Sequence, residues 1–411
     1  MSVASAVTKD EGMARAVENL EKSPFYSLAD LPDYVPEEEN PDILVKGRWL
    51  ERGGSAFWIS TAGTGKTILA QQLALCFAEG KPFAGLAPLR PLRVLIFQTE
   101  DSPTRLGIDR DDITAELSES YPDVDWRATW EKVIFAKNQG KTGAAFLERL
   151  DELLTEREFD FVILNPFFAF IGGDISQSAY VTPFLRGGDI NREQTTGLQF
   201  ILEQHRVGVL CFHHTNKPPN DQMLKSWLNS AFPEYQGAGS ADITNWGRSF
   251  ITMFRLPGKP EVVCLTAGKN GSELGWQRHG GAWRHYLANS RVTGVTGKGR
   301  HAWRELDAEE LSELTSTVFK ADGEDVLKLV AALKERPMTH AEAQKWRAGI
   351  MSSARFNSAW KEVTDDLGKH GLARVVVDVP ANKKPSYVGE PEAAKVAAEE
   401  AAGNWRRATN R

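Results

Sequence analysis

A glycine-rich segment near residue 60 carries the most specific chemical signal of the chain. Residues 60–67 read STAGTGKT, that is Ser60, Thr61, Ala62, Gly63, Thr64, Gly65, Lys66 and Thr67. Glycines let backbone N–H groups surround phosphate oxygens, and the N-terminus of a following helix adds partial positive charge. In this pattern the lysine reaches the β- and γ-phosphates and the threonine hydroxyl ligates Mg²⁺. The segment predicts a phosphate loop that binds ATP and Mg²⁺. Ser60 replaces the first glycine of the pattern, which a negative φ allows.

A carboxylate follows the next apolar run and could act on a bound nucleotide. Residues 93–98 read RVLIFQ, and Thr99, Glu100 and Asp101 come directly after them. A carboxylate at the C-terminal end of a strand beside a phosphate loop can orient or deprotonate the attacking water. Glu100 is therefore the candidate general base. The alternative is a pair of carboxylates that caps a helix beginning near Ser102.

Another apolar run ends in an amide where a metal-organising acid is expected. Residues 161–164 read FVIL and lead into Asn165. An amide offers Mg²⁺ a neutral carbonyl oxygen and lacks the full charge of a carboxylate. With Thr67 and Asn165 as the expected metal ligands, two interpretations stay open. Either Mg²⁺ is held mainly by Thr67, phosphates and water with weakened turnover, or the site binds nucleotide and hydrolyses it poorly.

Two histidines end a further apolar run. Residues 207–212 read VGVLCF and lead into His213 and His214. A polar residue at this place can contact the γ-phosphate and report its loss to the following loop. Neighbouring side chains on a strand point to opposite faces, so the pair is a poor zinc site. We expect one of the two histidines to be a γ-phosphate sensor, and a structural role is the alternative.

These residues need a sheet that brings strand ends together. Short β-rich runs alternate with helical stretches in the first part of the chain, and such alternation predicts a mainly parallel sheet with helices on both faces. The later runs lie closer together, which fits an antiparallel meander at one sheet edge. The expected strands are residues 55–60, 93–98, 161–168, 207–214, 249–254 and 261–268, and the clearest helices are residues 68–80 and 143–158.

The pattern divides the chain into five parts. Residues 1–40 are polar and are expected to form a flexible arm, and residues 41–290 form the main α/β domain. Residues 291–322, rich in Gly, Thr and Ser and then Glu, are expected to be a linker. Residues 323–389 hold three helix-like stretches and then two strands, the order of a winged helix. Residues 390–411, rich in Ala and Glu, are expected to be a tail that forms a frayed helix.

Composition narrows the class of protein. The chain has 411 residues, 41% of them hydrophobic and 25% charged, which are ordinary values for a globular protein. No run of about eighteen apolar residues exists, so no membrane span is expected. The acidic N-terminus lacks the apolar core of a secretory signal. The three cysteines are far apart in apolar stretches, which favours buried thiols in the cytoplasm. The net charge of −6 excludes a global basic field that would attract nucleic acid.

Several ordered segments together resemble one family. These segments are residues 41–54, 60–67, 80–102, 165–174, 212–217 and 237–250. They resemble the RecA-like ATPases of the plasmid RepA type, relatives of the DnaB-type replicative helicases, over residues 41–288. The resemblance implies a RecA-like core in a hexameric or otherwise ring-like ATPase, with ATP hydrolysed between subunits.

The resemblance also assigns roles to single residues. It implies that Glu100 is the catalytic acid and that His213 or His214 is the sensor at the end of its strand. It implies that Arg248 is an arginine finger that enters the neighbouring subunit's site, with a surface arginine on an edge element as the alternative. Lys269 lies where this family often has a second basic group. The family normally has Asp at the position of Asn165, a departure that bears on hydrolysis more than on nucleotide binding.

Nucleic acid could enter at two places. In RecA-like rings, loops corresponding to residues 172–189 and 216–240 line the channel. Basic groups with interleaved aromatics are typical of single-strand binding, although plain solvated loops are the alternative. The residues concerned are Arg186, Lys217 and Lys225, with Tyr180, Trp227 and Tyr235. In the C-terminal unit, Arg355 and Lys361 lie on the candidate recognition helix. Winged helices also dock proteins, so both uses stay open there.

Two functions follow from these features. The first is an ATP-dependent DNA motor, a replicative helicase or helicase loader of a plasmid, phage or mobile element. Its partners would be single-stranded DNA, further copies of the chain in a ring, and replication proteins. The second is a nucleotide-gated DNA-binding regulator with slow or absent hydrolysis, which Asn165 favours. A metabolic kinase is disfavoured, because the arginine-finger segment and the winged domain would have no role in it.

Overall fold

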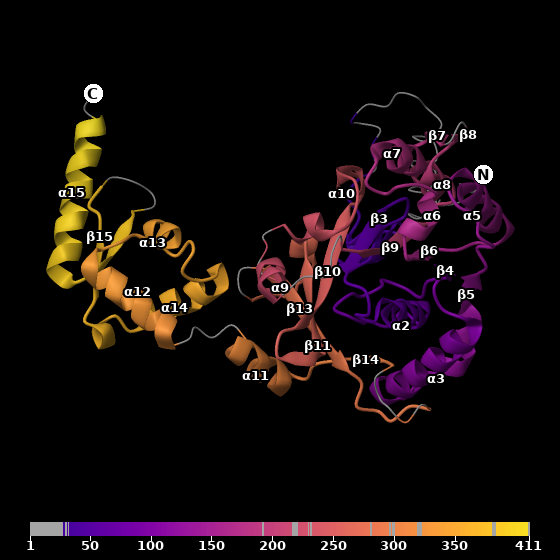
Figure 1. Cartoon of the computed structure of the whole chain (residues 1–411), viewed down its shortest axis with the longest axis horizontal. Helices are drawn as coiled ribbons and strands as arrows, with labels where there is room; N and C mark the ends of the chain where they lie inside the picture. The colour runs from indigo at the N-terminus through magenta and orange to yellow at the C-terminus, as the bar shows by residue number, and fades with distance from the viewer. Residues whose placement is uncertain are drawn as a thin grey trace, which may run out of the picture.

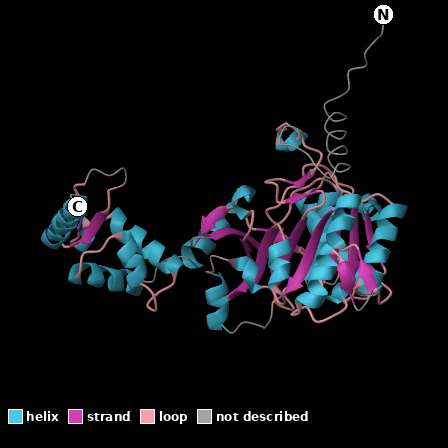
Figure 2. Ribbon diagram, turned by 90° about the horizontal axis from the view of Figure 1, so that it is seen from above, coloured by secondary structure: helices cyan, strands magenta, loops and turns pink. Residues whose placement is uncertain are grey.

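The computed structural model describes the chain from residue 33 almost to its end. The described residues are 28, 31, 33–190, 193–215, 221–228, 230, 232–279, 282–295, 297, 301–318, 323–379 and 384–409. They form a large α/β domain and a smaller C-terminal unit, which Figures 1 and 2 show in two orientations.

A ten-stranded sheet is the frame of the large domain. Its order is β12-β13-β11-β10-β3-β9-β6-β4-β5, and β14 pairs with β13. The strands from β10 to β5 run parallel, whereas β10, β11, β13, β12 and β14 form the antiparallel edge predicted for the later runs. The bounds are β3 (Ser55–Ser60), β4 (Val94–Gln98), β5 (Val133–Ala136), β6 (Phe161–Asn165), β9 (Gly208–His214), β10 (Ser249–Leu256), β11 (Lys259–Ala267), β12 (Gln277–His279), β13 (Ala282–Asn289) and β14 (Trp303–Glu305).

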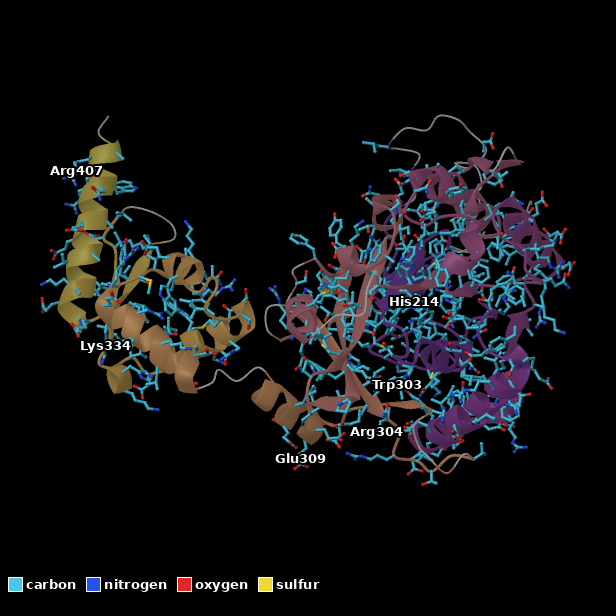
Figure 3. All side chains as sticks on the ribbon, in the orientation of Figure 1. His214, Trp303, Arg304, Glu309, Lys334 and Arg407 are labelled. Atoms are coloured by element: carbon cyan, nitrogen blue, oxygen red, sulfur yellow. The ribbon has the colours of Figure 1, made fainter. Side chains whose placement is uncertain are left out.

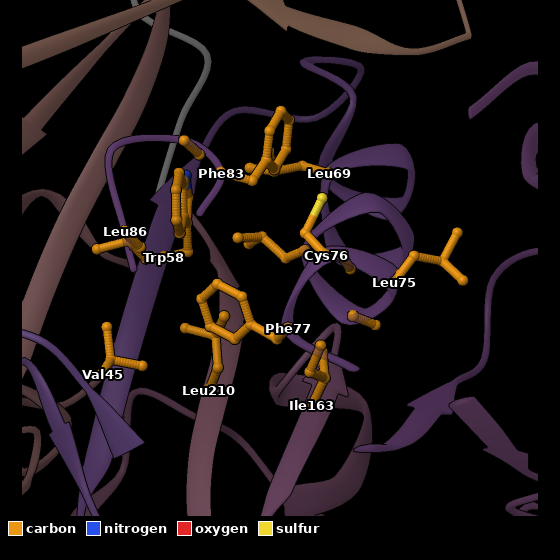
Figure 4. Packing of buried hydrophobic residues seen from close by; sticks show 14 of the residues in the cluster. Val45, Trp58, Leu69, Leu75, Cys76, Phe77, Phe83, Leu86, Ile163 and Leu210 are labelled. Atoms are coloured by element: carbon orange, nitrogen blue, oxygen red, sulfur yellow. The ribbon is translucent and has the colours of Figure 1, made fainter. Parts of the chain in front are cut away.

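Helices cover both faces of the sheet, because the central strands alternate between two cores. On β3, Ala56 and Trp58 face one core, and Phe57 and Ile59 face the other. The first core is covered by α2, α3 and α4, and Figure 4 shows Phe77 of α2 packed against Leu210 and Ile163 in it. The second is covered by α5, α7 and α8. The bounds are α2 (Lys66–Ala78), α3 (Pro103–Ser120), α4 (Trp126–Thr129), α5 (Ala144–Glu156), α6 (Phe168–Ile171), α7 (Ser178–Arg186), α8 (Leu198–Gln204), α9 (Asp221–Leu228), α10 (Ala241–Trp246) and α11 (Ala308–Val318).

Small elements complete the domain. Two strand pairs lie outside the main sheet, and short 3-10 turns join the larger elements. These are β1 (Ile43–Val45) with β2 (Leu50–Glu51), β7 (Gly188–Ile190) with β8 (Glu193–Thr195), η2 (Glu37–Glu39), η3 (Trp130–Lys132), η4 (Pro233–Gln236) and η5 (Gly271–Leu274). Within the described residues, no helix is both long and apolar enough to cross a membrane.

The structure corrects the expected linker over residues 291–322. This segment contains β14, which joins the main sheet beside β13, and then α11. Leu314 of α11 packs with β10, β11 and β13 in a further apolar cluster. The main domain therefore extends well beyond residue 290, because a strand that follows a polar stretch of about a dozen residues returns to its edge.

The C-terminal unit has the predicted order of three helices and two strands. Its elements are α12 (Gly323–Glu335), α13 (His340–Trp346), α14 (Ser353–Asp365), η6 (Gly368–His370), β15 (Ala373–Val376), β16 (Ser386–Gly389) and α15 (Pro391–Thr409). Leu329, Phe356 and Val363 are fully buried in its core. The helix expected in the tail from residue 390 is α15, and it packs Ala398 and Ala402 against the strand pair.

Candidate nucleotide-binding site

The predicted phosphate loop joins β3 to α2, as the motif requires. Gly65 is the N-cap of α2, with φ of 99°, and no side chain caps the helix there. The backbone N–H groups at this helix start are thus available to an anion. Ser60 ends β3 and pairs with His214 on β9, and its φ is negative. The serine therefore fits where the pattern has glycine.

The Lys66 ammonium lies inside the loop. Its Nζ donates to the carbonyl oxygen of Thr61 at 2.8 Å and to Nδ1 of His214 at 3.2 Å. The Thr64 hydroxyl donates to the same Thr61 carbonyl at 2.8 Å. Burial lowers the pKa of Lys66 to about 8, and the negative charge of Glu100 offsets part of that shift. The lysine is therefore placed to exchange neutral acceptors for charged phosphate oxygens.

ATP affinity should fall as the pH rises above about 8. Below this value the free protein carries a protonated Lys66, and phosphate binding needs no proton. Above it the free amine is neutral, so binding must take up a proton and Kd should rise by up to about tenfold per pH unit. Calorimetric titration with ATP at several pH values between about 7 and 9 would measure this. Lys66→Arg, which keeps its charge, should lose the pH dependence, and a constant Kd for the parent protein would contradict the assignment.

Asn165 lies beside the loop, at the carboxyl end of β6. It is fully buried, and its Nδ2 donates to the Thr67 hydroxyl oxygen at 3.1 Å. Its Oδ1 is buried without a hydrogen-bond partner. An unpartnered oxygen beside the Thr67 hydroxyl fits Mg²⁺, either directly or through a water. In the part of the chain that the structure describes, no three His, Cys, Asp or Glu side chains gather into a metal site. Thr67 and the Asn165 amide oxygen are the side chains here that could ligate the ion, together with phosphates and water.

Replacing Asn165 by aspartate should preserve or raise ATP hydrolysis and lower the Mg²⁺ concentration needed for half-maximal activity by about tenfold or more. The added carboxylate would accept from Thr67 and attract the cation. The same charge is buried, so the metal-free variant should unfold at a lower temperature. Mg²⁺ titrations of steady-state hydrolysis, with thermal unfolding measured alongside, test this. A large loss of activity in a folded variant would mean that the amide has a role of its own.

His214 bridges the loop and the candidate base. Its Nδ1 accepts from Lys66, and its Nε2 lies 3.8 Å from Oε1 of Glu100, whose side chain is 46% exposed. Burial, reinforced by the Lys66 charge, lowers the pKa of His214 to about 4, so the ring is neutral. The exposed Phe168 packs against it with ring centroids 5.5 Å apart. Figure 3 labels His214 at the centre of the main domain. Because Nδ1 accepts from Lys66, the neutral ring carries its proton on Nε2, and this N–H can donate to a phosphate oxygen.

His213 points away from the loop, so the structure brings only one of the two histidines to the phosphate site. Its Nε2 donates to the carbonyl oxygen of Ala238 at 2.6 Å. The ring packs edge-on against Phe57 and Phe167 in the second core. Burial lowers its pKa to about 4. Alternation along β9 explains the difference, because α2 and the loop lie on the face that His214 occupies.

Arg248 and Lys269 lie at the other end of the sheet. The N–H of Arg248 donates to Ser55, the first residue of β3, whereas the loop follows the last residue of that strand. The Arg248 side chain is exposed. The Lys269 ammonium contacts the carbonyl oxygens of Thr244 and Gly247 at the C-terminal end of α10. Neither group lies in this chain's own phosphate site, so a role in a neighbouring subunit stays a prediction.

The candidate nucleic-acid residues are scattered. Arg186 is exposed at the end of α7, and Lys361 is exposed on α14. Arg355 forms an ion pair with the buried Asp325 of α12, which gives it a structural partner. Lys217 lies outside the described residues, and although Lys225 falls within α9, its side chain is not described.

Sequence reasoning missed three aromatic residues, of which Phe168 and Trp303 lie at this site. Phe168 covers His214, and Trp303 of β14 contacts Gly65. Phe232 pairs with Tyr235, with ring centroids 6.4 Å apart, and both are about two-thirds exposed. Only the last could have been noticed from sequence, since Phe232 stands in the same polar segment as Tyr235.

One family model matches a part of the chain that contains the phosphate loop. Residues 26–220 match the model of a protein family described as an AAA domain. No curated protein matches the chain. It is similar in structure to the RadB recombinase, with 14% identity, a TM-score of 0.38, and 62% of this chain and 92% of that chain covered. It is also similar to the flagellar accessory protein FlaH from Methanocaldococcus jannaschii, with 13% identity, a TM-score of 0.35, and 62% and 91% covered.

The sheet, the loop and the family match together define a P-loop ATPase domain of the RecA-like type. The predicted fold class is confirmed. It is a RecA-like α/β sheet with helices on both faces and a further C-terminal region of helices and a small sheet. The match implies a nucleotide with Mg²⁺ as the ligands of the loop. The plasmid RepA type and a helicase role remain predictions.

Proposed function

We propose that this chain is an ATP-dependent DNA motor, a replicative helicase or helicase loader of a plasmid, phage or mobile element. The observation that supports it best is the contact chain from Lys66 through His214 to Glu100. These three groups supply what an ATPase needs. The lysine binds the phosphates, the carboxylate activates water, and the neutral imidazole senses the loss of the γ-phosphate. Glu100 acts as the base, His214 as the sensor.

The segment after β9 supports an output towards nucleic acid. His214 ends that strand, and its carbonyl oxygen accepts from the N–H of Ala238 at 2.8 Å. Between these two residues the chain carries the exposed rings of Phe232 and Tyr235. Exposed aromatic rings can stack on the bases of a single strand. A movement of His214 on ATP hydrolysis would therefore be transmitted through its hydrogen bond with Ala238 and a short stretch of chain to Tyr235 and Phe232.

Assembly into a ring completes the proposal. Arg248 is exposed at the sheet end opposite its own loop, as expected for a finger that serves the next subunit. A ring of identical subunits with head-to-tail contacts gives each loop one such arginine. DNA and replication proteins are the proposed partners of this assembly.

Steady-state ATP hydrolysis by the purified protein, with and without single-stranded DNA, tests the proposal. Strong stimulation by single-stranded DNA, absent in Lys66→Ala, is the expected result. Stimulation by duplex DNA alone, or none by any DNA in a protein that turns ATP over rapidly, would contradict a single-strand motor.

Asn165 favours one second candidate, a nucleotide-gated DNA-binding regulator. Its neutral, buried amide takes the place of a metal-organising carboxylate. In this case ATP binding would drive assembly of the protein on DNA, and the protein would leave the DNA only after slow hydrolysis of the ATP. Tight ATP binding with negligible turnover, with or without DNA, would select this candidate over the motor.

A further inference from the structure

A tryptophan from the end of the main domain lies against the phosphate loop. Trp303, the first residue of β14, is only 2% exposed. Its Nε1–H donates to the carbonyl oxygen of Gly65 at 3.4 Å. A Cβ atom on Gly65 would lie 2.8 Å from the indole ring, so a residue other than glycine would collide with it. Figure 3 labels Trp303 within the main domain.

A second contact fastens the same strand to α2. Gln72 is fully buried on that helix. Its Nε2 donates to the carbonyl oxygen of Trp303 at 2.6 Å, and its Oε1 accepts from the N–H of Trp303 at 2.9 Å. Gly65 and Gln72 are about two helical turns apart. Trp303 thus contacts α2 at two places. Its side chain bonds to the N-cap residue Gly65, and its backbone bonds to Gln72 two turns further along the helix.

The residue under the indole determines how the helix start faces a phosphate. Gly65 has the left-handed conformation, with φ of 99° and ψ of 28°. Its carbonyl oxygen also accepts the first helical hydrogen bond, from the N–H of Leu69 at 3.0 Å. The N–H groups that follow are those that bind an anion at a helix N-terminus. A rotation of Gly65 would turn them away.

We propose that Trp303 is a positioning residue for nucleotide binding, which holds Gly65 in the conformation that presents the start of α2 to phosphates. The proposal rests on the proposed function in one respect, because it assumes that the loop binds a nucleoside triphosphate. It extends the nucleotide site to β14, which the sequence assigned to a linker.

The chain contains a matched control in Trp276. This residue is 6% exposed, and its Nε1–H donates to the carbonyl oxygen of Gly85 at 2.8 Å. Gly85 also has a positive φ, of 68°, and a Cβ atom there would lie 2.5 Å from the indole nitrogen. The contact is of the same kind, but it lies in a loop without phosphate-binding residues. Loss of either indole should lower stability, and only Trp303 should govern nucleotide affinity.

The experiment compares the affinity of full-length variants for ATP and ADP by calorimetric titration, at a temperature where thermal unfolding shows each variant folded. Trp303→Ala should weaken both affinities by about tenfold or more, since small displacements of binding groups have large effects. Trp303→Phe keeps a ring over Gly65 and should recover most of the loss. Trp276→Ala should change the affinities by less than about twofold.

Wild-type affinity in folded Trp303→Ala would overturn the proposal, as would equal losses in Trp303→Ala and Trp276→Ala. Should Trp303→Ala fail to fold, Gln72→Ala decides the matter. It removes both backbone contacts, leaves the indole in place, and should weaken ATP affinity in the same direction; an unchanged affinity would overturn the proposal. Failure of the proposed function looks different, since the parent protein itself would then bind no nucleotide.

Discussion

Replacing Lys66 by alanine is expected to weaken ATP binding by about 100-fold or more, because each charge-assisted hydrogen bond to phosphate contributes about 1.5–3 kcal/mol. The fold should survive, since the lysine's contacts in the structure are one carbonyl oxygen and one neutral imidazole. Fluorescence titration with a labelled ATP analogue measures the loss. Hydrolysis should vanish with it.

Lys132→Ala is the matched control for this substitution. Lys132 is half-exposed and forms a surface ion pair with Glu79 at 2.6 Å. Exposed pairs of this kind contribute about 0–1 kcal/mol to stability, so the control should bind ATP like the parent. Retention of ATP affinity in Lys66→Ala would mean that the loop is not the nucleotide site.

Replacing Arg248 by alanine should spare ATP binding and lower turnover by about 10³-fold or more, the contribution of an arginine finger. The guanidinium is exposed at the sheet end opposite the loop, so its loss leaves the chain's own phosphate site intact. ATP affinity and turnover, measured on the same preparation, separate the two effects. Arg149→Ala, which removes a surface ion pair with Glu152 on α5, is the control and should change neither.

Mixing two inactive variants tests whether the site is shared between subunits. Lys66→Ala has an intact arginine and a defective loop, whereas Arg248→Ala has the reverse. In a randomly mixed ring, about a quarter of the interfaces would join an intact loop to an intact arginine. Hydrolysis should therefore reappear on mixing. Full turnover by Arg248→Ala alone, or no recovery in a mixture shown to co-assemble, would rule out the finger.

The local parts of the site were predictable from sequence. The residues of the loop are contiguous in sequence, and they stand between a strand and a helix. Local interactions alone therefore specify the motif. Asn165 and Glu100 were found because the carboxyl ends of parallel strands meet at one edge of a sheet. The structure brings both beside Lys66 and Thr67 through direct or bridged contacts.

The remaining parts depend on long-range packing. Both faces of β9 are buried, so burial patterns cannot tell whether His213 or His214 faces the loop. The choice follows from the side on which α2 packs. Lys269 was placed by resemblance, and the structure shows its ammonium on carbonyl oxygens of α10, a common way to stabilise a helix end. Trp303 had no local signal, because its partner helix lies far away in sequence.

Gln72 and Trp303, which contact each other, are 231 residues apart in the sequence, so they cannot meet until late in synthesis of the chain. A chain that emerges from the ribosome with its phosphate loop complete still lacks the strand that fastens α2. Contacts of such long sequence separation form late and slow folding. Nucleotide affinity should therefore mature only after β14 has been synthesised, which delays tight ATP binding until nearly the whole main domain exists.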